Sequence, residues 1–96
     1  QILPEAWVAE STQPLRPDPR KWELVPSWPG YSRYYTYHWW GLDNPDGTYD
    51  FYAHGKYDQI VYIAPRKNVV IVRLGNAPDE NVRWPLVLHN IVDQLP

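Results

Sequence analysis

The 96-residue chain contains no cysteine, which excludes disulfide bonds and thiolate chemistry and leaves its compartment open. No stretch approaches the roughly 20 apolar residues of a membrane-spanning helix, and the longest purely aliphatic run covers only residues 69–72. The formal net charge is −2, whereas nucleic-acid binding needs a basic surface. We therefore expect neither a membrane segment nor a nucleic-acid partner.

Large amphipathic rings are abundant instead: the chain has six Trp and eight Tyr but one Phe. Its length allows one small domain, residues 1–96, with a modest core. So many rings in so small a domain must either be buried or line a binding face.

The first 30 residues divide into two parts. Residues 1–13 predict a short helix, because Pro4 and Glu5 suit a first turn and Leu3 and Trp7 share one face. Residues 14–30 carry five prolines, which disfavour regular structure. Their Trp, Leu and Val content is too apolar for a disordered linker, so we expect a Pro-rich ordered loop.

Residues 31–75 predict an antiparallel sheet. One strand is expected over residues 31–42, with Tyr35, Tyr37 and Trp39 on one face, and a turn follows at residues 43–47. Strands 49–54, 58–64 and 69–74 complete the sheet. The last strand is apolar on both faces, so it needs cover on both sides.

A C-terminal helix is expected over residues 80–95. Asn81 can cap it, and the core stripe comprises Trp84, Leu88, Ile91 and Leu95, which places His89 in solvent. The fold class is thus α+β: a three-stranded or larger antiparallel meander, with the C-terminal helix packed on one face and a short N-terminal helix. The latter is too small to cover the whole second face.

The candidate site lies where strand 49–54 ends. Gly55 predicts a sharp turn between His54 and Lys56, with Tyr57 beside them. This group is either a polar rim that binds an anion or polarises a carbonyl, or a solvated hairpin corner. His38, beside Trp39 and Trp40, is either a ligand contact or, as we expect, a structural histidine in the core or behind a site. No His pair has metal-ligand spacing and no serine lies in a nucleophile motif, so we expect no metal, cofactor or covalent nucleophile.

Three segments follow one another in a specific order: ILPEAWVAEST, YYTYHWWGL and GTYDFYAHGKYDQIVYIAPRKNVVIVRLGN, before a helix that begins with Trp. Together they resemble the C-terminal third of serine hydrolases of the β-lactamase and penicillin-binding-protein superfamily. The nearest branch is that of the β-lactamase-related esterases and 6-aminohexanoate-dimer hydrolases. The resemblance covers residues 2–95 and is most specific over residues 51–74.

The resemblance implies that the chain is a fragment of the β-lactamase/transpeptidase-like fold. Its partner would be the upstream part of the same hydrolase, which carries the acylating Ser, and its substrate a small ester, amide or β-lactam. His54-Gly55-Lys56 would match the third motif of the family, with the Tyr57 N–H as oxyanion donor. A shifted alignment makes the Lys56 N–H the donor.

The aromatic residues leave other interpretations open. Three aromatic residues are candidates to line the substrate cleft of such a hydrolase: Tyr37, Trp39 and Trp40. The resemblance itself does not assign them this role. Alternatively, the Trp- and Tyr-rich sheet belongs to a non-catalytic module that binds carbohydrate or peptide, since sugar rings and bases stack on such side chains. A structural interaction domain is the third possibility.

Overall fold

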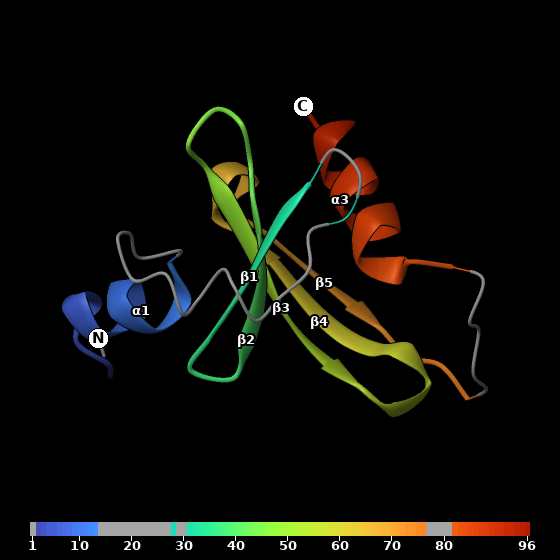
Figure 1. Ribbon diagram of the computed structural model, residues 1–96, viewed down its shortest axis with the longest axis horizontal. Coiled ribbons are helices and arrows are strands. Elements are labelled where there is room, and N and C mark those ends of the chain that lie inside the picture. Colours follow the sequence, from blue (N-terminus) through green and yellow to red (C-terminus); the bar gives the residue numbers. More distant parts are fainter. Residues whose placement is uncertain (1, 14–27, 29–30, 77–81) are drawn as a thin grey trace.

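The computed structural model of the protein describes residues 2–13, 28, 31–76 and 82–96. Helix α1 (Glu5–Thr12) precedes a five-stranded antiparallel sheet, and helix α3 (Trp84–Asp93) follows it (Figure 1). The strands, in chain and spatial order, are β1 (Ser32–Thr36), β2 (Trp39–Asp43), β3 (Tyr49–Gly55), β4 (Gln59–Ala64) and β5 (Val69–Arg73). The α+β antiparallel meander is confirmed. The predicted loop and the Asn81 cap fall almost entirely outside the described residues.

The single strand predicted over residues 31–42 is wrong, because the chain turns back in its middle. Tyr37 (φ 46°) and His38 (φ 70°) are both left-handed and form the two-residue turn between β1 and β2. Left-handed Tyr and His are uncommon, so neither residue signals a turn in the sequence. His38 is therefore exposed at a hairpin tip and is not a buried histidine.

The turn predicted at Gly55 is also displaced. Gly55 is extended (φ −115°) and ends β3 opposite Gln59, so it does not bend the chain. A short 3-10 turn, η1 (Lys56–Asp58), connects β3 to β4, and its left-handed residues are Tyr57 (φ 62°) and Asp58 (φ 58°). The two Pro- or Gly-marked connections, at residues 43–48 and 65–68, lie where the sequence predicts them.

The main core lies between one face of the sheet and α3. Its buried side chains are Leu42, Tyr52, Ile60, Tyr62, Ala64, Leu88 and Val92. The α3 side chains that are buried are Pro85, Leu88, His89 and Val92, at i, i+3, i+4 and i+7.

The predicted stripe on α3 is correct at Leu88, which is buried in the core, and at Trp84, which packs against it, and it is wrong at Ile91, which is 45% exposed. His89, expected in solvent, is only 6% exposed.

On the other face, Tyr34 fastens the end of α1 to the sheet. Its ring is fully buried over Gly41, and its hydroxyl donates a 2.7 Å hydrogen bond to the carbonyl of Thr12. Burial is the main reason that the pKa of Tyr34 lies well above its usual value. Helix α1 thus docks through its C-terminal end, while Trp7 and Val8 remain partly exposed.

Replacing Gly41 with Ala is expected to destabilise the protein by about 1–3 kcal/mol, because the added methyl group overpacks this contact. A Cβ at position 41 would lie 2.0 Å from the Tyr34 ring. Urea denaturation followed by Trp fluorescence measures the loss. Gly55→Ala is the matched control, since a Cβ there meets nothing closer than 3.7 Å. An equal loss in both variants would contradict the packing argument.

Candidate functional site

The second half of β3 is a free sheet edge. Among the described residues, the pairs between β2 and β3 cover Tyr49–Tyr52, with Trp40 opposite Tyr52, and β2 begins at Trp39, so it ends before His54 and Gly55. Residues 53–55 pair with β4 on one side and, among the described residues, with no strand on the other. Such an edge presents backbone N–H and C=O groups to a ligand. Of the predicted residues, His54 and Gly55 lie on this edge, and Lys56 and Tyr57 lie in the η1 turn that follows it.

His54 and Asp58 tie the strand to the turn. Nε2 of His54 lies 2.7 Å from Oδ1 of Asp58, and both side chains are partly exposed. The His54 ring also lies 6.0 Å from that of Tyr52, measured between centroids. Lys56 extends over the Tyr57 ring instead, with Nζ 5.0 Å from its centroid. His54 and Lys56 are the two basic side chains of the candidate site. His54 contacts the Asp58 carboxylate, whereas Lys56 contacts the Tyr57 ring.

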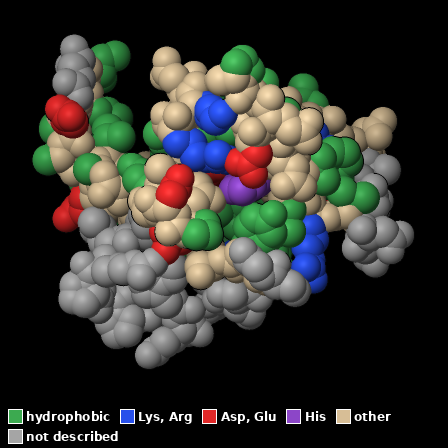
Figure 2. Space-filling view, turned by 90° about the horizontal axis from the view of Figure 1, so that it is seen from above, with side chains coloured by type: hydrophobic (Ala, Val, Ile, Leu, Met, Phe, Trp, Pro, Cys, Tyr) green, Lys and Arg blue, Asp and Glu red, His purple; other side chains and the backbone are tan. Residues whose placement is uncertain are grey.

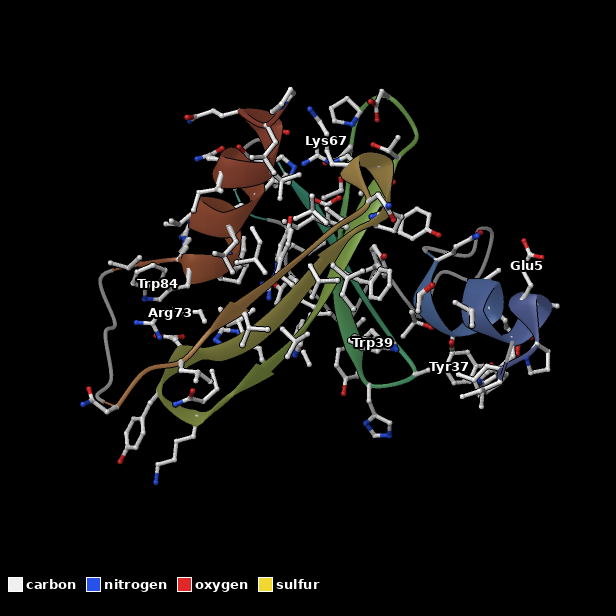
Figure 3. The ribbon with its side chains drawn as sticks, turned by 180° about the vertical axis from the view of Figure 1, so that it is seen from behind. Glu5, Tyr37, Trp39, Lys67, Arg73 and Trp84 are labelled. Atoms are coloured by element: carbon white, nitrogen blue, oxygen red, sulfur yellow. The ribbon has the colours of Figure 1, made fainter. Side chains whose placement is uncertain are left out.

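Arg73 fixes the turn from the neighbouring strand. One guanidinium nitrogen donates to the carbonyls of Tyr57 (3.1 Å) and Asp58 (2.8 Å). The guanidinium also stacks 3.9 Å above the Trp84 ring, and Figure 3 shows the two side chains next to one another. These contacts hold two left-handed residues in place. Nothing in the sequence connects Arg73 with a turn 15 residues earlier.

A shallow groove of about 340 Å³ starts at the free edge and crosses β4 to β5. Its lining residues are Ala53, His54, Gly55, Gln59, Ile60, Val61, Val72, Arg73 and Leu74. The Gln59 amide bonds both the N–H and the carbonyl of Gly75, which holds the chain beyond β5 against this end of the groove. The side chains that reach into the groove are mostly aliphatic.

The other candidate residues do not come together. Tyr37 lies at the β1–β2 turn with its ring 5.4 Å from that of Trp7 (Figure 3). Trp39 packs edge-on against Phe51, whereas Trp40 lies on the opposite face of β2 against Tyr35. The three side chains therefore do not form one wall.

A buried polar network, not evident from the sequence, joins β3 to the far end of α3. The Asp50 carboxylate is fully buried and accepts two hydrogen bonds from Arg66, at 3.0 and 3.1 Å, and one from Tyr62, at 2.5 Å. Arg66 also donates to Asp93 at 2.6 Å. Figure 2 shows basic, acidic and His side chains gathered at this end of the molecule.

The network shifts the pKa of two of its members upward. Hydrogen bonding to Asp50 is the main cause for Arg66, whose pKa rises above its usual value. Burial, followed by the bond to Asp50, raises that of Tyr62. Both groups thus keep their protons, and the arrangement is suited to holding the fold rather than to proton transfer.

His89 connects α3 to the β2–β3 turn. Its Nε2 lies 2.8 Å from Oδ1 of Asn44, and its Nδ1 lies 3.3 Å from Oδ2 of Asp93. The ring packs edge-on against Tyr31. Thr48 accepts a hydrogen bond from Nδ2 of Asn44, which orients the amide so that its oxygen faces His89.

His89→Ala is expected to cost about 1–3 kcal/mol, because it leaves the Asn44 oxygen without this partner and opens a cavity under α3. Thermal unfolding followed by circular dichroism measures the effect. Asn90→Ala, on the exposed side of the same helix, should change stability by less than about 0.5 kcal/mol. If both variants behave alike, His89 does not anchor the helix.

The described residues contain no group of three or more His, Cys, Asp or Glu placed to hold a metal ion. None of the helices in the described part of the chain is long and apolar enough to cross a membrane. Compared with known proteins, the chain matches no protein-family model, no curated protein and no solved structure.

Proposed function

We propose that this chain supplies the oxyanion-binding edge of a serine hydrolase that acts by acyl transfer on an ester, amide or β-lactam. The observation that carries the proposal is the edge of β3 at residues 53–55, which contains His54, is followed by Lys56 and pairs on its outer side with no strand of the described part of the chain. A substrate carbonyl laid against this edge would meet those backbone N–H groups of β3 that point away from β4. The resemblance to the β-lactamase-related hydrolases supports the same assignment.

The Lys56 N–H is the donor that fits best. Gly55 precedes the 3-10 turn, so its carbonyl accepts the first bond of that turn and points into it. The N–H of Lys56 lies trans to this carbonyl across a planar peptide and therefore points away from the turn, toward the free edge. Tyr57 is less suited, because it is left-handed and lies within the turn.

The chemistry assigned to this edge is stabilisation of negative charge. A serine outside these 96 residues attacks the substrate carbonyl carbon, and the carbonyl oxygen becomes the oxyanion of a tetrahedral intermediate. A fixed backbone donor stabilises this charge more than it stabilises the neutral carbonyl, which lowers the barrier. The rigid η1 turn keeps the donor in place through the contacts of Arg73 and Asp58.

The interpretation as a carbohydrate- or peptide-binding module has less support. A stacking platform needs ring faces that lie open in one plane. Here the Trp39 and Phe51 rings meet at 77°, and the Trp40 and Tyr35 rings at 60°. These rings pack against one another as pairs within the sheet.

Hydrolysis of p-nitrophenyl esters tests the proposal. The 96-residue chain alone should show no turnover, and a natural polypeptide that carries it after about 250–300 further residues, the scale of a two-domain protein, should be active. Turnover by the short chain would contradict the assignment of the nucleophile. Absence of turnover in both would contradict the proposed function.

A further inference from the structure

A series of hydrogen bonds in the β2–β3 turn determines which atom of the Asn44 amide faces His89. The Asp46 carboxylate accepts one bond from the hydroxyl of Thr48, at 2.5 Å, and one from its N–H, at 2.9 Å. The hydroxyl bond, followed by the N–H bond, lowers the pKa of Asp46, so this group is an ionised acceptor. The Thr48 hydroxyl has one proton and donates it to Asp46, so it can only accept from Nδ2 of Asn44, 3.0 Å away. The amide oxygen of Asn44 is therefore the atom that faces His89.

This orientation assigns the first of the two ring protons of His89. Oδ1 of Asn44 lies 2.8 Å from Nε2 of His89. An amide oxygen accepts hydrogen bonds and cannot donate them, so Nε2 must carry a hydrogen. The ring is only 6% exposed and packs edge-on against Tyr31, which leaves water little access to its nitrogen atoms.

The second ring nitrogen of His89 faces a carboxylate. Nδ1 is buried and has no hydrogen-bond partner among the described residues, but Oδ2 of Asp93 lies 3.3 Å from it, within the range of an ion pair. A bare Nδ1 would direct its lone pair at this oxygen and be repelled, whereas a protonated ring would be attracted. The other oxygen of Asp93 accepts a hydrogen bond from Arg66 at 2.6 Å, which favours the ionised carboxylate. The geometry therefore fits an imidazolium ring better than a neutral one.

The charges around this contact favour the same protonation state. The charged groups on the described elements at this end of the molecule are Asp93 on α3, Arg66 and Lys67 in the 3-10 turn η2 (Pro65–Lys67), Asp50 on β3 and Asp46 in the β2–β3 turn. Lys67 donates to the carbonyl of Leu95 and does not contact a carboxylate in the network. Arg66 is shared between Asp50 and Asp93, so one guanidinium faces two carboxylates. A protonated His89 supplies the second positive charge.

We propose that His89 carries both ring protons in the folded protein and forms a pH-sensitive contact between α3 and the β2–β3 turn. Its Nε2–H bonds Asn44, and its Nδ1–H pairs with Asp93. The folded state then holds a proton that the unfolded chain releases near about pH 6.5, so the stability of the protein falls as the pH rises. The inference does not depend on the proposed function, because this contact lies at the opposite end of β3 from the candidate site.

The nitrogen chemical shifts of the imidazole rings test the proton assignment directly, because they distinguish protonated from bare ring nitrogens. His38 is the internal reference, since it is exposed at a hairpin tip. Through the pH range in which His38 loses its proton, both ring nitrogens of His89 should remain protonated. Loss of the Nδ1 proton of His89 together with that of His38 would overturn the proposal, and so would a neutral His89 ring over the whole range.

The pH dependence of thermal unfolding provides the second test. Between about pH 5.5 and pH 8 the Tm of the wild type should fall by about 5 °C. Asp93→Asn keeps an oxygen for Arg66 but removes the charge beside Nδ1, so it should abolish at least about half of this fall. His38→Gln is the matched control and should leave the fall unchanged. The same fall in Asp93→Asn as in the wild type would overturn the proposal, as would a fall that disappears in His38→Gln.

Discussion

Asp50→Ala is expected to lower the free energy of unfolding by about 3–5 kcal/mol. The substitution removes the carboxylate that accepts two hydrogen bonds from Arg66 and one from Tyr62. A guanidinium and a hydroxyl then remain in a site from which water is largely excluded, and their desolvation is no longer compensated. This loss is a large part of the 5–15 kcal/mol that stabilises a typical domain. Urea denaturation gives the value.

Two further variants separate the buried charge from a general loss of charge. Asp93→Ala removes the half-exposed partner of the same Arg66, and it should cost no more than about 1 kcal/mol. Asp50→Ala combined with Arg66→Met removes both buried charges and should recover part of the stability lost in the single variant. Equal losses for Asp50→Ala and Asp93→Ala would show that burial of the carboxylate is not the cause.

Under the proposed function, Lys56→Pro in a longer polypeptide with esterase activity is expected to lower kcat about 10²- to 10³-fold, because it removes the proposed backbone donor to the oxyanion. Gly55 has the extended backbone that a residue before proline requires, so the turn accepts the substitution. Steady-state kinetics with a p-nitrophenyl ester measures the change.

Lys56→Ala is the matched variant, since it keeps the N–H and removes only the ammonium group. Its kcat should remain within about threefold of the wild type, because the chain from Cβ to Nζ reaches toward the Tyr57 ring rather than along the free edge. Were the two variants to lose activity equally, the side chain and not the backbone would be the functional group. Unfolding temperatures of both variants control for damage to the turn.

The elements that the sequence predicts correctly are those with local signals. Pro45 and Gly47 mark the β2–β3 turn, and Pro65 marks the β4–β5 connection. The existence of strand β5 and of both helices follows in the same way from local pattern. The cover predicted for both faces of β5 is not found among the described residues, since Val70 and Val72 are 63% and 58% exposed. The hairpin at Tyr37 and His38 has no such marker, because both left-handed residues carry full side chains.

The burial of His89 and Asp50 was not predicted, because it depends on contacts with residues far away in the sequence. The predicted stripe on α3 includes Ile91, whereas the helix turns His89 inward because Asn44 offers it a hydrogen-bond acceptor 45 residues earlier in the chain. Periodicity alone does not reveal that partner. Asp50 is buried in a strand for the same reason, since Arg66 reaches it from the β4–β5 connection.

The sequence predicts only those residues of the candidate site that are neighbours along the chain. His54, Gly55, Lys56 and Tyr57 are contiguous in sequence and remain contiguous at the edge of β3. The groups that fix their geometry are not local, because Arg73 comes from β5 and stacks on a helix residue, Trp84. The free edge itself depends on where β2 begins, which the missed hairpin determines.

A crystal structure of the longer polypeptide inactivated with a p-nitrophenyl phosphonate would show whether the backbone at the end of β3 binds the oxyanion, as we propose. The phosphonyl oxygen of such an adduct occupies the position of the oxyanion. We expect it about 2.7–3.1 Å from the backbone nitrogen of Lys56. An adduct whose oxygen is bound by other groups, with residues 53–57 out of reach, would refute the proposed oxyanion site.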